Sequence, residues 1–257
     1  MNTMLTDLSI LWPALIAGVL VAISHVPLGQ QVLSRGIVFI DLAIAQVAGL
    51  GVIAANCFHL PIEGWGAQLA AGAAALAGAL LLTWTERKRP EVQEALIGIL
   101  FVLASTAQIL LLANDPHGGD NLKDLLAGQI LWVSNAQLIR TAAVTAVFAL
   151  AWFLWREKMG RVGFYVLFAL VVTASVQLVG VYLVFTTLIV PAVATYRHLR
   201  QRQLAFGYLL AVGSYVVGLG VSVVTDMPSS PVIVWAMGVL GLLLHLTGRN
   251  GAASTRT

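Results

Sequence analysis

Long runs of apolar residues, separated by short polar breaks, dominate the pattern of this chain. A helix needs roughly 20 mainly apolar residues to cross the hydrocarbon core of a bilayer, and runs of that length recur from Leu11 to Leu246. The runs are continuous, whereas the strands of a membrane barrel alternate apolar and polar positions. We therefore expect an all-α, polytopic membrane protein with eight or nine transmembrane helices. The expected spans are 11–29, 37–57, 67–85, 93–113, 136–155, two short spans within 162–195, 204–224 and 231–247.

Lys and Arg gather in five of the breaks, and this predicts a topology. The clusters hold twelve of the fourteen basic residues: Arg35; Arg87, Lys88 and Arg89; Arg156, Lys158 and Arg161; Arg197, Arg200 and Arg202; Arg249 and Arg256. The positive-inside rule assigns all of them to the cytoplasm. The block 162–195 has a basic cluster at each end, so it must cross an even number of times, with a turn near Val179 and Gly180. We expect the N-terminus outside and the C-terminus in the cytoplasm.

Composition excludes a water-soluble protein, because 59% of the residues are apolar and 10% are charged, with a mean hydropathy of +0.91. The single cysteine, Cys57, excludes an intrachain disulfide and a multi-cysteine metal cage. Because the basic residues serve topology, membrane lipid is an expected partner and nucleic acid is not. Because the sequence contains no Pro- or Ser-rich linker, residues 1–257 are expected to form one transmembrane domain. Residues 247–257 are expected to be a disordered cytoplasmic tail.

Motifs for soluble catalysis are missing from the sequence. It contains no GxxxxGK[ST] stretch to hold the phosphates of ATP and no HExxH pair for zinc. We therefore expect no bound cofactor and no catalytic residue. The energy for any transport must come from an ion gradient or from another subunit.

Two polar residues in the second expected span are candidates for a substrate path. Ionisable groups are costly in mid-membrane and mark transport routes, and Asp41 is the best candidate by depth, with Gln46 further along the same span. The two are about 140° apart around an ideal helix, so they share a face only loosely. The plainer alternatives are an Asp41 held by backbone groups or by Arg35, and a Gln46 that makes an interhelical hydrogen bond.

The outward-facing breaks carry further polar groups. His59 with Glu63, and His117 with three aspartates, put metal-capable side chains on these loops, although solvated loop polarity explains both groups more simply. The aspartates are Asp115, Asp120 and Asp124. Asp226 and Pro228 belong to a turn on the periplasmic face.

The stretch from Leu188 to Gln203 joins a proline-bearing span to a short basic segment on the cytoplasmic side. Tyr196, Arg197, His198, Leu199, Arg200 and Arg202 could form an amphipathic helix that is presented to a partner. The same arginines also mark the cytoplasmic face. The two interpretations are compatible.

Four stretches in a fixed order resemble the membrane permeases of bacterial ATP-binding-cassette (ABC) importers for zinc, manganese and iron, the ABC-3 type. They are Pro27-Leu28-Gly29 with Arg35 and 39–51; Asp124 to Val133; Val179-Gly180 through Ala192; and Asp226 to Pro231. The resemblance covers nearly the whole chain. It implies the bundle of a type II ABC importer in the bacterial inner membrane, working as a homodimer with two ATPase subunits inside and a metal-binding lipoprotein or periplasmic protein outside. The stretch from Tyr196 to Gln203 would then be the coupling helix seated in the ATPase.

The sequence departs from this family in the second span. Members usually carry a Gly-Asp pair and a His four residues after the Asp. Here that His aligns with Gln46, the Asp aligns with Leu42, and Asp41 takes the place of the Gly. Gln is a poor zinc ligand beside His. The loop from Trp155 to Val162 is also shorter than in relatives, so a changed substrate or a less selective metal path is possible.

Three functions remain open from the sequence. The first is the permease subunit of an ABC importer for a divalent transition metal, with zinc or manganese favoured, iron possible and ATP bound on the partner subunit. The second is a stand-alone secondary transporter that uses Asp41. The third is an intramembrane enzyme or assembly protein, which the lack of paired carboxylates or a Ser/His dyad disfavours.

Overall fold

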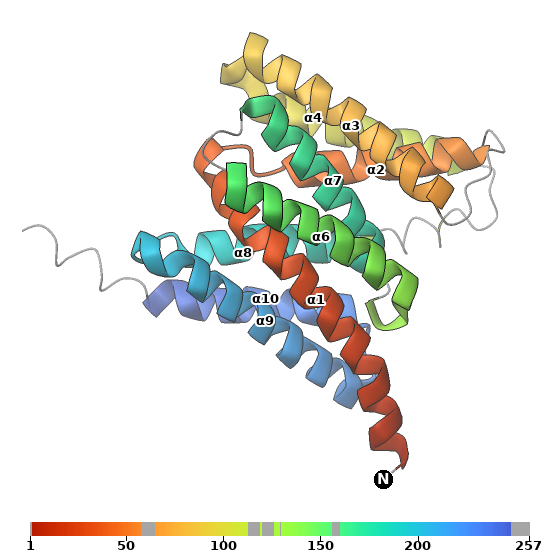
Figure 1. Ribbon diagram of the computed structural model, residues 1–257, viewed down its shortest axis with the longest axis vertical. Coiled ribbons are helices and arrows are strands. Elements are labelled where there is room, and N and C mark those ends of the chain that lie inside the picture. Colours follow the sequence, from red (N-terminus) through yellow and green to blue (C-terminus); the bar gives the residue numbers. More distant parts are fainter. Residues whose placement is uncertain are drawn as a thin grey trace, which may run out of the picture.

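The computed structural model of the protein describes residues 2–57, 65–112, 119, 126–128, 130–155 and 160–247, and side chains from residue 11 onward except those of residues 65, 153, 155 and 247 (Figure 1). The described residues form long helices and short 3-10 turns, with no strand, which confirms the all-α expectation. The helices are α1 Asn2–Arg35, α2 Ile40–Cys57, α3 Trp65–Lys88, α4 Gln93–Leu112, α6 Asn135–Trp155, α7 Arg161–Val179, α8 Val181–Thr195, α9 Arg200–Thr225 and α10 Ser229–Thr247; the 3-10 turns are η1 Pro90–Val92 and η2 Ile130–Trp132.

Several residues singled out from the sequence lie outside the described residues. They are the loop groups His59, Glu63, Asp115, His117, Asp120 and Asp124, the basic residues Arg156, Lys158, Arg249 and Arg256, and the tail 248–257.

The expected spans correspond to these helices. Seven described helices are both long and apolar enough to cross a membrane. The 21-residue α6 and the shorter α8 bring the described bundle to nine long helices. The first span was predicted too short, because α1 continues past Gly29 through Gln30 and Gln31 to Arg35. Polar residues at a cytoplasmic helix end do not stop the helix when their side chains can reach the membrane surface.

The helices pack in three groups. Figure 1 shows α3 and α4 on one side of the bundle, α8, α9 and α10 on the other, and α1, α6 and α7 between them. The helix α2 packs against α3, α4 and α7, while α1 packs against α8, α9 and α6. In α7, 67% of the spanning window is buried, against 17% in α4. The centre of the bundle is therefore α7, and α4 lies at its edge.

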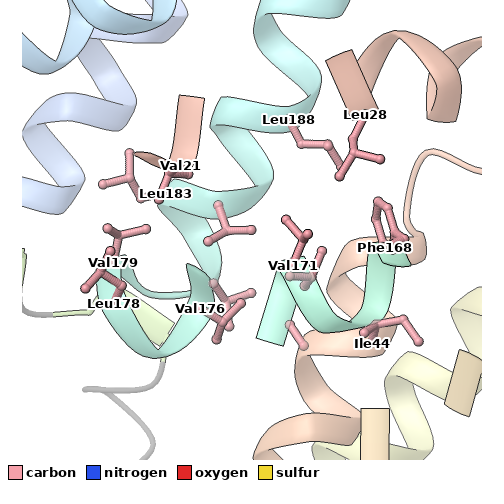
Figure 2. Packing of buried hydrophobic residues seen from close by; sticks show 14 of the residues in the cluster. Val21, Leu28, Ile44, Phe168, Val171, Val176, Leu178, Val179, Leu183 and Leu188 are labelled. Atoms are coloured by element: carbon pink, nitrogen blue, oxygen red, sulfur yellow. The ribbon is translucent and has the colours of Figure 1, made fainter. Parts of the chain in front are cut away.

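The core is apolar and takes side chains from all nine long helices of the described bundle, four of which contribute the labelled side chains of Figure 2. Figure 2 shows Val21 of α1 beside Leu183 of α8, and Leu28 beside Leu188, while Phe168 and Val171 of α7 lie toward Ile44 of α2. In lipid, packing rather than water exclusion favours such contacts. Close approach of backbones helps: a Cβ on Gly29 would collide with the carbonyl of Leu188.

The break inside 162–195 falls at Gly180, which confirms the turn expected near Val179 and Gly180. Gly180 has φ 85° and ψ 162°, a conformation open mainly to glycine. The 15 residues of α8 span only about 22 Å, less than the roughly 30 Å of the hydrocarbon core. Irregular backbone at membrane depth is tolerated where protein covers it, and here the backbone of Ala127 and Gly128 lies against Gly180.

The described basic helix ends lie together on one face. The guanidinium of Arg35 at the end of α1 lies 4.0 Å from the ring centroid of Phe164 in α7. Arg161 at the start of α7 is 3.9 Å from Glu86 near the end of α3. At the far side of the bundle, His245 of α10 reaches the carbonyl oxygen of Val193 in α8 at 3.2 Å. This is the face that the basic clusters of the sequence mark as cytoplasmic.

Candidate functional site

Buried polar side chains gather along the contact between α2 and α4. Asp41, in the first turn of α2, is 1% exposed, Gln46 is 2% exposed, and Gln108 of α4 is fully buried. Glu94, in the first turn of α4, is half-buried. Most other residues of both helices are apolar, and we call these four residues the α2–α4 polar seam.

Gln46 and Gln108 hydrogen-bond directly across the seam. The Nε2 of Gln108 donates to the backbone carbonyl oxygen of Gln46 at 2.8 Å and to its side-chain Oε1 at 2.8 Å. The interhelical hydrogen bond that the sequence allowed for Gln46 is thus present. Buried amides in lipid need such partners.

Asp41 is bound less completely. Neither of its carboxylate oxygens has a hydrogen-bond partner of good geometry among the described residues. Its nearest electrostatic neighbours include the backbone amides of Asp41 and Leu42, at the positive end of the α2 dipole, and the carboxylate of Glu94. The pairing with Arg35 that the sequence left open is not made, because that guanidinium lies over Phe164.

Glu94 ties the start of α4 to the start of α2. Its Oε1 accepts a hydrogen bond from the backbone amide of Phe39 at 3.2 Å, two residues before Asp41, while its Oε2 is buried without a partner. A helix start leaves unpaired amides, and a carboxylate satisfies one of them. The seam therefore has two carboxylates near the basic face of the bundle and the Gln46–Gln108 pair further along both helices.

The seam offers oxygen atoms rather than nitrogen or sulfur. Carboxylate and amide oxygens suit hard divalent cations, whereas zinc prefers His and Cys. No group of three or more His, Cys, Asp or Glu that could hold a metal ion occurs in the part of the chain that the structure describes. The arrangement does not form a tight zinc centre within these residues.

The basic segment before α9 is a turn and not a separate amphipathic helix. Residues 196–199 link α8 to α9, and Arg200 and Arg202 belong to the first turn of α9 itself. Gln203 braces the turn, since its Nε2 donates to the carbonyl oxygens of Tyr196 at 3.3 Å and His198 at 3.1 Å.

The side chains of this turn point outward. Tyr196 is 69% exposed and Leu199 is 60% exposed. All three arginines, Arg197, Arg200 and Arg202, are exposed as well. The ring of His198 lies edge-on to Phe206, with centroids 5.1 Å apart. The turn therefore presents an aromatic ring, an apolar side chain and three cations to whatever faces it.

At the opposite ends of α9 and α10, Asp226 and Pro228 form the expected turn. Asp226 ends α9 in the left-handed conformation with φ 55°, and its amide donates to the carbonyl oxygen of Ser222. The hydroxyl of Ser222 in turn donates to the carbonyl oxygen of Met227 at 2.6 Å. Both Asp226 and Pro228 are exposed.

Gln108 and Glu94 were not selected from the sequence. Each is a polar residue within or beside an apolar run, and such a residue indicates a functional or interhelical contact. The sequence also suggested no role for His25, which is fully buried in α1 with its Nδ1 3.0 Å from the carbonyl oxygen of Val21 and its Nε2 unpartnered. Two of the stretches that carry the resemblance meet in space, because Gly128 and Gly180 touch through their backbones.

Comparison with known proteins gives one family and a consistent fold. The model of the ABC 3 transport family matches residues 7–164 and 158–247. PsaBC from Streptococcus pneumoniae in complex with Fab matches with a TM-score of 0.74 and 21% identity, over 91% of this chain and 90% of that chain. An inward-facing conformation of a protein described as a metal-chelate type ABC transporter matches with a TM-score of 0.67 and 17% identity, over 92% and 85%. At these identities the two structures establish the fold.

Proposed function

Because this chain belongs to the ABC 3 transport family, we propose that it is the transmembrane permease subunit of an ABC importer for a divalent transition metal, zinc or manganese before iron. The observation that carries the proposal is the extent of the family match, which runs from residue 7 to residue 247. The fold shared with two ABC transporter structures supports it.

In this proposal the chain performs no catalysis and binds no cofactor of its own. The sequence has no phosphate-binding motif, so ATP is bound and hydrolysed by a separate ATPase subunit. The turn formed by 196–199 with Arg200 and Arg202 is the surface for that subunit. Its exposed cations and apolar side chains can seat in a partner surface, and movement of the partner is passed to α8 and α9.

The substrate path follows the α2–α4 polar seam. Asp41 and Gln46 were selected for this role from the sequence, and Gln108 and Glu94 join them through the contacts described above. A cation that passes here meets carboxylates near the cytoplasmic end. Because the carboxylate of Asp41 has no hydrogen-bond partner and no permanent ion pair among the described residues, it is available to a cation that passes along the seam.

The remaining partners follow from the family and the orientation. The basic face is cytoplasmic and the turn with Asp226 and Pro228 is periplasmic, where a metal-binding protein or lipoprotein docks. The permease works as a homodimer in the lipid of the bacterial inner membrane. The N-terminus lies outside and the C-terminus inside.

The buried, unpartnered carboxylate of Asp41 also favours a second candidate, a stand-alone secondary transporter in which Asp41 binds the coupling ion. The two candidates differ in one requirement. The importer needs an ATPase and the secondary transporter does not.

The test is to express the chain with and without its genomically adjacent ATPase in cells that lack their own metal importers. Accumulated zinc, manganese, iron and cobalt are measured by elemental analysis, and an ATPase with a disabled catalytic residue serves as control. Accumulation that depends on the active ATPase supports the importer and names the metal. Accumulation without any ATPase supports the secondary transporter, and no accumulation of any metal refutes the metal-importer assignment.

A further inference from the structure

Gln108 occupies an unusual place on its helix. Most of α4 faces outward, and the residues buried on it, Gln93, Ile97, Ala104 and Gln108, form a narrow inward stripe. Within this stripe Gln108 hydrogen-bonds to α2, and it is fully buried. A polar side chain in this position is costly unless its hydrogen bonds are specific.

The two hydrogen bonds fix the orientation of both amides. A backbone carbonyl oxygen can only accept, so the atom of Gln108 that faces the carbonyl of Gln46 must be the donor Nε2. The same Nε2 faces the side chain of Gln46, so the atom of Gln46 that it meets must be the acceptor Oε1. Gln108 thereby dictates which end of the Gln46 amide points toward α4.

This orientation determines what position 46 can offer to a substrate. The Oε1 of Gln46 accepts a hydrogen bond from α4, which uses one of its two acceptor positions, and its other end, Nε2, is a donor that cannot bind a cation. The Oε1 of Gln108 is a neutral acceptor that is buried without a partner. The charged acceptors of the seam are the carboxylates of Asp41 and Glu94, which attract a cation more strongly than either amide oxygen does.

Resting on the proposed function, we propose that Gln108 is a specificity-determining positioning residue. By holding Oε1 of Gln46 it weakens position 46 as a cation ligand, so the path selects an oxygen-preferring divalent cation mainly through its carboxylates. Removal of Gln108 therefore frees the side chain of Gln46, and this changes which cation the path prefers.

Gln108→Glu is the sharpest variant, because it keeps the shape and removes the donor. An ionised carboxylate at 108 can only accept, so both hydrogen bonds to position 46 are lost: the backbone carbonyl oxygen of Gln46 loses its partner in α4, and the Gln46 side-chain amide turns over, donates Nε2 to Glu and frees Oε1 beside a new negative charge. We expect the KM for Mn²⁺ uptake to fall about tenfold, with a lower maximal rate because release becomes slower. Gln108→Leu removes the donor without adding charge, and we expect a smaller shift in the KM ratio of Mn²⁺ to Zn²⁺.

A double-mutant cycle separates positioning from a merely structural role. If Gln108 acts through Gln46, Gln108→Leu shifts the KM ratio in the wild-type background and has no effect in a Gln46→Leu background. Equal shifts in both backgrounds, or an unchanged ratio in Gln108→Leu, overturn the proposal. The ratio does not depend on protein yield. Ser105→Ala, which removes a hydroxyl without a hydrogen-bond partner on the preceding turn of α4, is the matched control and should leave the ratio unchanged.

A binding measurement distinguishes failure of this inference from failure of the proposed function. If the wild-type chain with its ATPase accumulates no metal, the importer assignment fails, and the pair is then tested on the purified chain by equilibrium dialysis with Mn²⁺ salts. Tighter Mn²⁺ binding by Gln108→Glu than by wild type supports the positioning role. Identical binding by wild type, Gln108→Glu and Gln108→Leu overturns it.

Discussion

Replacing Gly180 with alanine should destabilise the bundle at the point where α7 turns into α8. Gly180 has φ 85°, and a Cβ added there would collide with the backbone nitrogen of Gly128 and lie 2.6 Å from the carbonyl carbon of Ala127. Both obstacles are backbone atoms, so no side-chain rotation can relieve the contact.

The expected magnitude has two parts. A non-glycine residue in a sparsely populated backbone region costs about 1–3 kcal/mol, and overpacking in a closely packed site costs about 1–3 kcal/mol more. The sum is about 2–6 kcal/mol. Even 2 kcal/mol corresponds to a fall in Tm of roughly 4–8 °C for a domain of this size.

The assay is thermal unfolding of the detergent-solubilised protein, followed as loss of the monodisperse peak on size-exclusion chromatography. Gly98→Ala is the matched control, because Gly98 lies inside α4 and an added Cβ meets nothing within 4 Å. That variant should be neutral or up to about 1 kcal/mol more stable, as expected for Gly→Ala in a helix. A Gly180→Ala protein that melts within about 1 °C of wild type would refute the argument from backbone contact.

Three further predictions concern transport. Reversing the charge of Arg197, Arg200 and Arg202 to Glu should uncouple the partner ATPase while the protein remains inserted; normal metal uptake by this variant would exclude the turn as the coupling surface. Asp41→Asn should reduce uptake several-fold, because it removes a carboxylate from the path, and unchanged uptake would return Asp41 to a packing role. Gln46→His should raise zinc preference, since His is the better zinc ligand, and an unaltered selectivity profile would place Gln46 off the path.

Much of the fold follows from the sequence because lipid imposes a simple rule. Backbone groups in the hydrocarbon core must be satisfied within a helix, so each apolar run of sufficient length predicts one. The even number of crossings in 162–195 follows from the basic clusters at its two ends. The length of this block, which allows two short spans, then places the turn near its middle, at Gly180. The end of α1 was misjudged because hydropathy marks where the lipid ends and not where the helix does.

The partners of each polar residue could not be predicted in the same way. Hydropathy along one span says nothing about which helix lies beside it, so the pairing of Gln46 with Gln108, 62 positions away, needed the structure. The segment 196–203 was expected to form its own helix because it is a short basic stretch after a proline-bearing span and resembles the coupling helix of the family. It instead divides between a turn and the start of α9, since Leu199 has the extended ψ of 133° that separates the two helices.

The residues that fix the packing of the helices differ from those that line the proposed substrate path. The stretches around Gly128 and Gly180 match the family and meet in a backbone contact that allows little variation. By the resemblance, the departures within the second span are Leu42 and Gln46 of α2, and the side chain of Gln46 is held by α4, the least buried of the candidate spans. A helix at the edge of the bundle can change its inward side chains without disturbing the packing of α1, α7 and α8. On the proposed path, a change of substrate therefore requires few substitutions, and positions 46 and 108 are where they would act together.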